Sequence, residues 1–401
     1  MRWLGGWLVS VVVAVGACSS DDVEDTPPGG GTGADAGTSK TTEGGASSSS
    51  SSGDAGPAVP TEPAVQYVGR FLVDGEARTV GWPGSRIVAR FEGTSVSAKL
   101  DETPLYEGPS VFDVKVDGTT TKLTLEEGAK TYELAKDLAA GPHQVELFRR
   151  TEGQVGLTIF RGLDFGGGKL LPPPPPKLRR IEILGDSGST GYGVECTDPS
   201  GTFTGATQNF GKAWPAKLGA MFDADVIAIG YGGKGVIQNF DRSDPVHMED
   251  LFVRTVPESA DPKWDFSKSP VDVLVVMLGG NDWDQPNPGD PAPGFAAFKA
   301  GYAKLIGLAR EKYPKAKIVS ALAPTQSDEY PEGYQARSNQ RKAFTEVVAE
   351  RKSGGDDAIA FVEVAKSTES EQTGCEFHPN EGLHTRIANE IAAAVKSATG
   401  W

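Results

Sequence analysis

The chain has 401 residues, a formal net charge of −15 at pH 7, and 38% hydrophobic residues. This length allows two or three folded domains, since a domain usually takes ~100–200 residues. The acidic balance, and the lack of a Lys and Arg cluster that could follow a phosphate backbone, argue against nucleic acid as a partner.

The first segment has the features of an export signal. Residues 1–17 carry a positive charge at Arg2, then an apolar core, then small residues that lead into Cys18 in the sequence VGAC. The apolar part is shorter than the ~18 residues that a spanning helix needs. VGAC resembles a bacterial lipoprotein box, which implies lipidation of Cys18 and a lipid anchor to the bacterial cell envelope, at the outer membrane or cell surface. The alternative is an ordinary signal peptide that contains a cysteine.

Composition divides the next part of the chain into three stretches. Residues 18–62 are rich in Ser, Gly, Thr and Asp with little to bury, which predicts a disordered tether. Residues 63–170 alternate apolar and polar residues in short runs between glycine turns, which predicts a small all-β sandwich, jelly-roll-like. We expect it to be a scaffold and substrate platform. Five prolines then predict a stiff spacer over 171–178.

From residue 179 to 401 the pattern changes to longer apolar runs that alternate with amphipathic segments of helix length. The runs lie at 181–184, 225–230, 271–278, 316–322 and 358–364. This alternation predicts an α/β domain of three layers, with helices on both faces of a parallel sheet. Ligands in such folds bind beyond the carboxyl ends of the strands, so we expect the loops there to surround one cleft.

Residues suited to acyl transfer occur on these loops. Ser187 follows the first run in GDSGS, and His378 precedes the last helix in CEFHPN. A serine hydroxyl is a weak nucleophile unless a neighbouring imidazole takes its proton. The oxyanion that forms needs fixed donors, and three are available: the N–H of Ser187, the N–H of Gly233 and the side-chain amide of Asn281.

In chain order, GDS, a glycine after the second strand, GGND and HPN resemble the four sequence blocks of the SGNH (GDSL) hydrolases. The preceding FRRTEGQVG, with RRIEILGDS, GYG and GGKG, resembles carbohydrate esterase family two, whose members deacetylate plant-type polysaccharides. This resemblance covers about residues 67–401. It implies Ser187 as nucleophile, His378 as base and acid, and Ser187, Gly233 and Asn281 as the oxyanion hole.

The resemblance also raises a question about what orients His378. The superfamily commonly has Asp three residues before this histidine, where this chain has Cys375. We expect the carboxylate of Glu376 to take that role, in preference to a backbone carbonyl. Trp283, two residues after Asn281, is a candidate for stacking on a sugar ring, and core packing is its alternative role.

Cysteine and histidine usage bears on stability and metals. If Cys18 is lipidated, Cys196 and Cys375 remain in an exported protein, and one disulfide between them is the simplest arrangement. Two unpaired buried thiols are the alternative. Neither His nor Cys occurs at ligand spacing, so we expect no metal and no other cofactor.

The sequence therefore predicts a monomeric, exported serine esterase that removes acetyl groups from a polysaccharide or oligosaccharide of xylan or glucomannan type. A lipase or general small-ester hydrolase is one alternative, and it predicts an apolar acyl pocket. A non-catalytic glycan-binding lipoprotein is another. The presence of Ser187, Gly233, Asn281 and His378 together argues against a site that has lost its activity.

Overall fold

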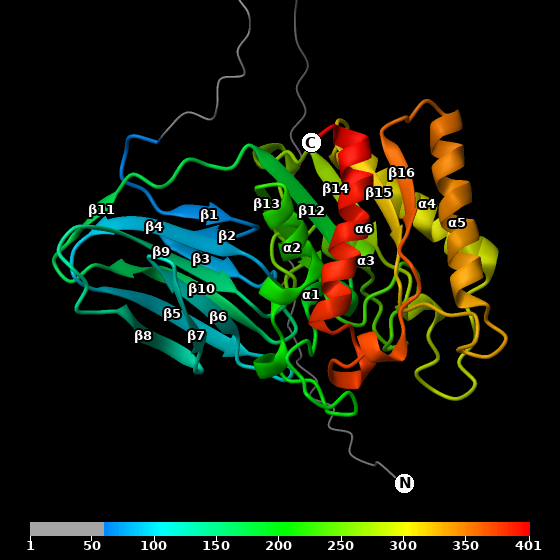
Figure 1. Ribbon diagram of the computed structural model, residues 1–401, viewed down its shortest axis with the longest axis horizontal. Helices are drawn as coiled ribbons and strands as arrows, with labels where there is room; N and C mark the ends of the chain where they lie inside the picture. The colour runs from blue at the N-terminus through cyan, green and yellow to red at the C-terminus, as the bar shows by residue number, and fades with distance from the viewer. Residues whose placement is uncertain (1–59) are drawn as a thin grey trace, which may run out of the picture. The chain divides into compact units, whose positions relative to one another are not determined.

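The computed structural model describes residues 60–401, and Figure 1 shows an all-β region followed by an α/β region. The predicted signal segment, Cys18 and nearly all of the predicted tether lie outside the described residues. Of the spacer predicted over 171–178, Leu171 is the last residue of the last strand of the first region, and residues 172–178 lie between it and the first strand of the second region.

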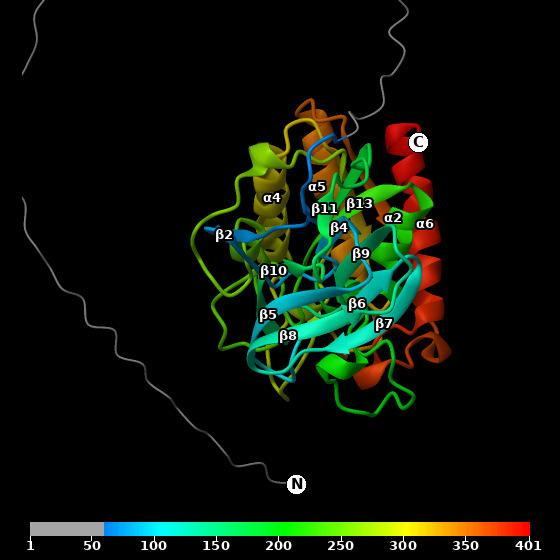
Figure 2. The same ribbon diagram turned by 90° about the vertical axis from the view of Figure 1, so that its left-hand side faces the viewer.

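Two antiparallel sheets build the all-β region (Figure 2). Their strands are β1 (Gln66–Val68), β2 (Leu72–Asp74), β3 (Ala77–Val80), β4 (Arg86–Glu92), β5 (Val96–Pro104), β6 (Val111–Val116), β7 (Thr119–Thr124), β8 (Gly128–Ala135), β9 (Pro142–Arg149), β10 (Gly156–Asp164) and β11 (Lys169–Leu171). One sheet has the order β1-β4-β9-β6-β7, with β11 paired to β4, and the other has the order β2-β3-β10-β5-β8. Successive side chains on a strand point to opposite faces, so alternate residues such as Phe91, Leu100 and Val145 form one shared core.

A parallel sheet forms the centre of the α/β region. Its strands are β12 (Arg179–Gly185), β13 (Ala224–Gly230), β14 (Val273–Met277), β15 (Lys317–Leu322) and β16 (Ile359–Glu363). The helices are α1 (Ser187–Thr190), α2 (Trp214–Met221), α3 (Met248–Phe252), α4 (Phe295–Lys312), α5 (Ala336–Ser353) and α6 (Glu381–Thr399). Every residue of β14 is buried, because helices cover both faces of the sheet.

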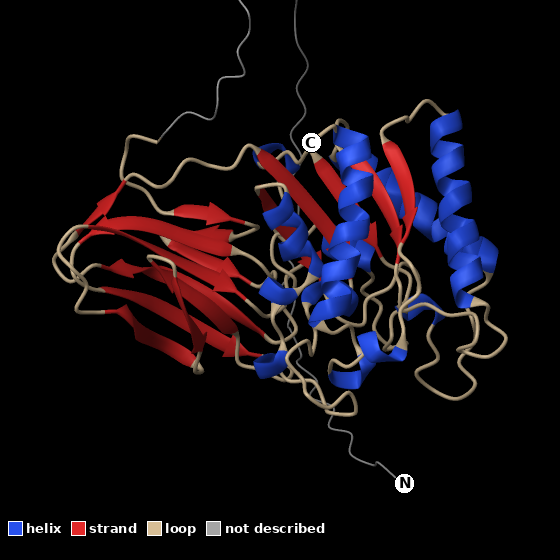
Figure 3. Ribbon diagram, viewed as in Figure 1, coloured by secondary structure: helices blue, strands red, loops and turns tan. Residues whose placement is uncertain are grey.

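The helices divide between the two faces (Figure 3). One core contains α2 and α6 side chains such as Leu218 and Ile387, and the other contains α4 and α5 side chains such as Tyr302 and Phe344. The predicted three-layer α/β fold, preceded by an all-β region, is confirmed.

Strand order places the cleft. The order is β13-β12-β14-β15-β16, so the strands that follow β12 in the chain lie on opposite sides of it. The loops that leave β12 and β14 therefore diverge at their carboxyl ends, which is where open α/β sheets bind ligands. Ser187 begins α1 two residues after β12, and Asn281 lies four residues after β14.

The two regions pack into one compact unit. The buried side chain of Arg70, between β1 and β2, enters the α/β region. Its guanidinium donates to the carbonyl of Phe252 at 2.6 Å and to the carboxylate of Glu182 on β12 at 3.1 Å. The all-β region is thus joined to the strand that carries the nucleophile candidate.

Candidate active site

The turn between β12 and α1 presents Ser187. Asp186 is the N-cap of α1, and its carboxylate accepts a hydrogen bond from the N–H of Gly188 at 3.0 Å. Because Ser187 is the first residue of the helix, its own N–H has no acceptor within α1. The turn therefore leaves both the hydroxyl and the N–H of Ser187 available at the cleft.

His378, in the loop between β16 and α6, lies beside this hydroxyl. Its Nε2 lies 2.8 Å from Oγ of Ser187, although 191 positions separate the two residues. Its Nδ1 lies 3.1 Å from the carbonyl oxygen of Cys375. A carbonyl only accepts, so Nδ1 carries the proton and Nε2 presents its lone pair to the hydroxyl. Burial lowers the pKa of His378, which favours the neutral imidazole that this pairing requires.

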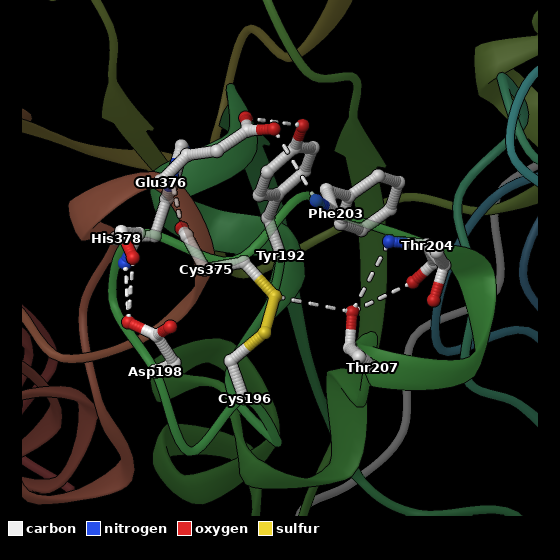
Figure 4. Close-up of a disulfide and its surroundings, with 10 residues drawn as sticks. Tyr192, Cys196, Asp198, Phe203, Thr204, Thr207, Cys375, Glu376 and His378 are labelled. Carbon is white, nitrogen blue, oxygen red and sulfur yellow. Dashed lines mark hydrogen bonds between the residues drawn. A yellow bond between two sulfur atoms is a disulfide. The ribbon is translucent and has the colours of Figure 1, made fainter.

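The prediction that Glu376 orients His378 is wrong. The carboxylate of Glu376 accepts from the hydroxyl of Tyr192 at 2.9 Å and from the N–H of Phe203 at 3.2 Å (Figure 4). Glu376 has a φ of 53°, and this sharp turn directs its side chain away from the imidazole while it brings the carbonyl of Cys375 to Nδ1. The backbone carbonyl, the alternative considered from the sequence, is the partner.

Asn281 lies in a short 3₁₀ turn after β14, with its side-chain amide near Asp186, the residue before the nucleophile candidate. Its Nδ2 donates to the carbonyl of Lys234 at 2.9 Å and lies 3.5 Å from the carboxylate of Asp186. Lys234 follows Gly233, whose φ of 74° is in the left-handed region that favours glycine. The amide of Asn281 is thus tied to the glycine loop after β13.

Asp282 fixes the same loop, a role that the sequence analysis missed. Its buried carboxylate accepts from the N–H groups of Val236 at 2.8 Å, Ile237 at 2.7 Å and Gln238 at 3.0 Å. The signal in the sequence is an acid directly after Asn281, paired with a glycine-rich loop whose N–H groups need acceptors.

A cavity of about 510 Å³ opens at this end of the sheet. Ser187, Asn281 and His378 line it together, and Gly233 is not among the residues that line it. Gly233 lies next to Phe240, which does line the cavity: the N–H of Phe240 donates to the carbonyl of Gly233 at 2.7 Å. Of the residues predicted as nucleophile, base and oxyanion donors, the structure therefore brings all except Gly233 to one cavity, and the oxyanion role of Gly233 stays a prediction.

The prediction that Trp283 stacks on substrate is wrong. Trp283 borders the cavity but is only 2% exposed, and its ring packs edge-on against Phe298 of α4 at 5.5 Å. Packing against α4 leaves no ring face open to a sugar. The exposed aromatic side chains that line the cavity are Phe240, Tyr330 and Phe377.

The predicted disulfide between Cys196 and Cys375 is present, with Cα atoms 5.2 Å apart (Figure 4). Tyr192 lies beside it, stacked on Phe203 with ring centroids 3.7 Å apart and 4.3 Å from the ring of His378. The histidine loop is thus held by a covalent bond and by aromatic packing.

Residues 60–401, which the structure describes, offer neither a metal site nor a membrane span. They contain no group of three or more His, Cys, Asp or Glu residues placed to hold a metal ion. None of their helices combines the length and hydropathy of a membrane span.

Two families match the chain, one for each region. Residues 67–174 match the family described as carbohydrate esterase 2 N-terminal, and residues 183–386 match the GDSL-like lipase/acylhydrolase family.

Characterised relatives cover most of the chain. It is 31% identical over 344 residues to the cellulase/esterase CelE of Acetivibrio thermocellus, which covers 84% of this chain and 40% of that protein. The chain therefore spans less than half the length of CelE. It is also 24% identical to an acetylxylan esterase/glucomannan deacetylase of Cellvibrio japonicus, over 85% of this chain and 90% of that protein.

A solved structure supports the same relationship. The family two carbohydrate esterase from Clostridium thermocellum, solved in complex with cellohexaose, is 30% identical and has a TM-score of 0.77. The comparison covers 84% of this chain and 100% of that one.

Proposed function

Because the chain belongs to carbohydrate esterase family two, within the GDSL-like hydrolases, we propose that it is a serine esterase that removes acetyl groups from a polysaccharide of xylan or glucomannan type. The observation that carries the proposal is the 2.8 Å contact between Nε2 of His378 and Oγ of Ser187. Relatives named acetylxylan esterase/glucomannan deacetylase support this substrate class.

The geometry accounts for the first half of the reaction. Nε2 of His378 takes the hydroxyl proton while Oγ of Ser187 bonds to the acetyl carbonyl carbon. The carbonyl of Cys375 keeps its hydrogen bond to Nδ1–H as the ring becomes an imidazolium. The N–H of Ser187 and the amide of Asn281 donate to the oxyanion, with the N–H of Gly233 as the third expected donor.

The second half releases both products. The imidazolium gives its proton to the departing sugar oxygen, and the acetyl group stays on Ser187 as an ester. Water then attacks that ester while Nε2 of His378 takes its proton. Collapse of the second tetrahedral intermediate returns a proton to Oγ and frees acetate.

The walls of the cavity favour a carbohydrate over a long acyl chain. Its lining includes the exposed rings of Phe240, Tyr330 and Phe377 together with polar side chains such as Gln326 and Ser327. A lipase needs a continuous apolar pocket, which this lining interrupts. A binding protein without activity has no need of the hydrogen bond between Ser187 and His378.

Acetate release by the purified protein tests the proposal. Acetylated xylan, acetylated glucomannan and a long-chain aryl ester are compared, with Ser187→Ala as the matched control for activity that needs the nucleophile. We expect turnover on an acetylated polysaccharide and its loss in Ser187→Ala, with glycan binding retained. Preference for the long-chain ester would replace this proposal with the lipase alternative.

We also propose that the protein is exported and held at the bacterial cell envelope by a lipid on Cys18, and that it is a monomer. The sequence of residues 1–18 supports the anchor. Cys18→Ala is expected to leave the membrane fraction or to block processing, and unchanged fractionation would exclude the anchor. Sedimentation of the purified protein measures its oligomeric state.

A further inference from the structure

We propose that Glu152, in the loop between β9 and β10 of the all-β region, is a positioning residue for the esterase reaction. Its buried carboxylate fixes the position of the nucleophile helix α1 relative to the glycine loop after β13. This inference rests on the proposed function and assigns the all-β region a part in catalysis beyond that of a scaffold or substrate platform.

The carboxylate of Glu152 bonds to both elements at once. Its Oε2 accepts a hydrogen bond from the N–H of Gly232, and its Oε1 lies 3.2 Å from the hydroxyl of Thr190, the last residue of α1. Its Oε1 also accepts from Nε2 of Gln208 at 2.9 Å. The carbonyl of the same Gln208 side chain accepts from the N–H of Glu152 at 3.1 Å, which fixes the position of the acid.

The contacts with Thr190 and Gly232 each lead to a site residue. The hydroxyl of Thr190 lies 3.2 Å from the carbonyl oxygen of Ser187 as well as from Glu152. Gly232 immediately precedes Gly233, the expected third oxyanion donor. One carboxylate therefore contacts the last residue of the nucleophile helix and the residue that precedes an expected oxyanion donor.

The neighbouring residues of the same loop contact the remaining parts of the site. The side-chain amide of Gln154 packs close to Gly232, since a Cβ at position 232 would lie 2.6 Å from its Nε2. Val155 is buried in a small apolar cluster with Phe203 and Cys375, the residue whose carbonyl orients His378. The loop 152–155 thus meets the nucleophile helix, the glycine loop and the histidine loop.

A substrate platform is a poorer explanation of this loop. Among the described residues, none of positions 66–171 lines the cavity that contains Ser187 and His378. Glu152 itself is 0% exposed, so it reaches substrate only through other residues. Glu152 therefore contributes by keeping the reacting groups in place, and a displacement of ~1 Å in a reacting group can cost ~10² in rate.

The bonding pattern calls for a carboxylate at position 152. Gly232, Thr190 and Gln208 all present donors, and an ionised carboxylate only accepts. Burial raises the pKa of Glu152 to about 7, and these hydrogen bonds oppose that rise. In Glu152→Gln, whichever way the amide turns, its NH₂ group faces at least one N–H donor.

Glu152→Gln is tested against Glu182→Gln as a matched control. Glu182 is also a fully buried carboxylate, and it joins the two regions through Arg70 at 3.1 Å. It accepts a second hydrogen bond from Tyr313 of its own region at 2.9 Å, and it does not line the cavity. We expect both variants to lower the melting temperature. Only Glu152→Gln is expected to lower kcat, by ~10–100-fold, with KM within ~3-fold of wild type, because it disturbs the placement of reacting groups.

Thr190→Val, which replaces Thr by a side chain of similar shape, tests the inference if Glu152→Gln does not fold. It removes the hydroxyl that meets Glu152, so we expect a smaller fall in kcat and an unchanged KM. Where both fold, the double variant should lose less than the product of the single losses, because the two residues act through one contact. An unchanged kcat in folded Glu152→Gln, an equal kcat loss in Glu182→Gln, or an unchanged kcat in Thr190→Val would each overturn the inference. Wild type and Ser187→Ala are assayed beside them, so failure of the proposed function appears as an inactive wild type.

Discussion

Cys375 is bonded to His378 through its carbonyl oxygen, 3.1 Å from Nδ1, and to Cys196 through its sulfur. The atom that sets the tautomer of the base therefore belongs to a residue whose side chain is covalently fixed. A backbone carbonyl carries no net charge, so it orients the imidazole but stabilises the imidazolium less than a carboxylate does. Ser187 and His378 are therefore arranged as a dyad with a backbone carbonyl on Nδ1, and the disulfide supports this arrangement.

The first prediction concerns Glu376. Its carboxylate bonds to Tyr192 and Phe203, so Glu376→Ala should keep kcat within ~10-fold of wild type, whereas loss of a general base in His378→Ala should cost ~10²–10⁴. Steady-state kinetics on an acetyl ester measure both. A loss in Glu376→Ala as large as that in His378→Ala would restore the carboxylate as the orienting group.

The second prediction concerns the disulfide. Cys196→Ser leaves the carbonyl of Cys375 in place but frees the loop that carries it. Closing so long a loop is worth ~2–4 kcal/mol, so this variant should unfold at lower denaturant concentration. Its kcat should also fall, because His378 loses a fixed partner. Reduction of the wild-type protein serves as the control, and unaltered stability and kcat in both would contradict the prediction.

Sequence patterns were sufficient for the parts of this site that depend on strand ends. Ser187 and Asn281 follow strands of the parallel sheet, and His378 lies in the loop after its last strand. The carboxyl ends of such strands meet at one edge of the sheet. Side-chain direction could not be predicted in the same way. Glu376 turns to Tyr192 because of its left-handed backbone, and Trp283 turns into α4, and both directions depend on neighbours distant in the sequence.

The role of Glu152 could not be predicted from the sequence, for a related reason. It lies in a segment predicted as sandwich strands and turns, 35 positions before Ser187, and a single acid in such a turn is usually solvated. Its importance appears only when packing buries it against Gly232 and Thr190. Hydrogen bonds between regions leave no periodic trace in either one.

The third prediction concerns pH. The base must be neutral to accept the proton of Ser187, and burial lowers the pKa of His378 below its ordinary value. The histidine therefore stays active as the pH falls below ~6.5 and becomes protonated only as the pH passes its lowered pKa. The negative charge of Glu376 opposes this lowering, so Glu376→Gln should lower the pKa of His378 further and shift its acidic limb of kcat/KM to lower pH.

Asp186 titrates nearby, since burial raises the pKa of its carboxyl to about 7, and it needs a separate control. The negative charges of Asp282 and Glu152 raise the pKa of Asp186 further. A limb that belongs to Asp186 should therefore keep its position in Glu376→Gln. A profile of kcat/KM that is the same in both proteins would assign the limb to a group other than His378.

The last prediction separates the two kinds of aromatic residue at the cavity. Phe377, immediately before the base, is 62% exposed and lines the cavity, while Trp283 is 2% exposed. Phe377→Ala removes a ring that a sugar can contact, so KM on acetylated polysaccharide should rise while KM on a small aryl acetate, which does not extend that far, stays the same. Trp283→Ala should instead destabilise the fold by ~3–5 kcal/mol, as loss of a buried aromatic does. Kinetics on the two substrates and denaturant titrations measure both effects. Trp283→Phe keeps most of the packing and serves as the control. A ring that serves only the core affects both substrates equally, so a rise in KM on the polysaccharide alone would show that the indole contacts the sugar.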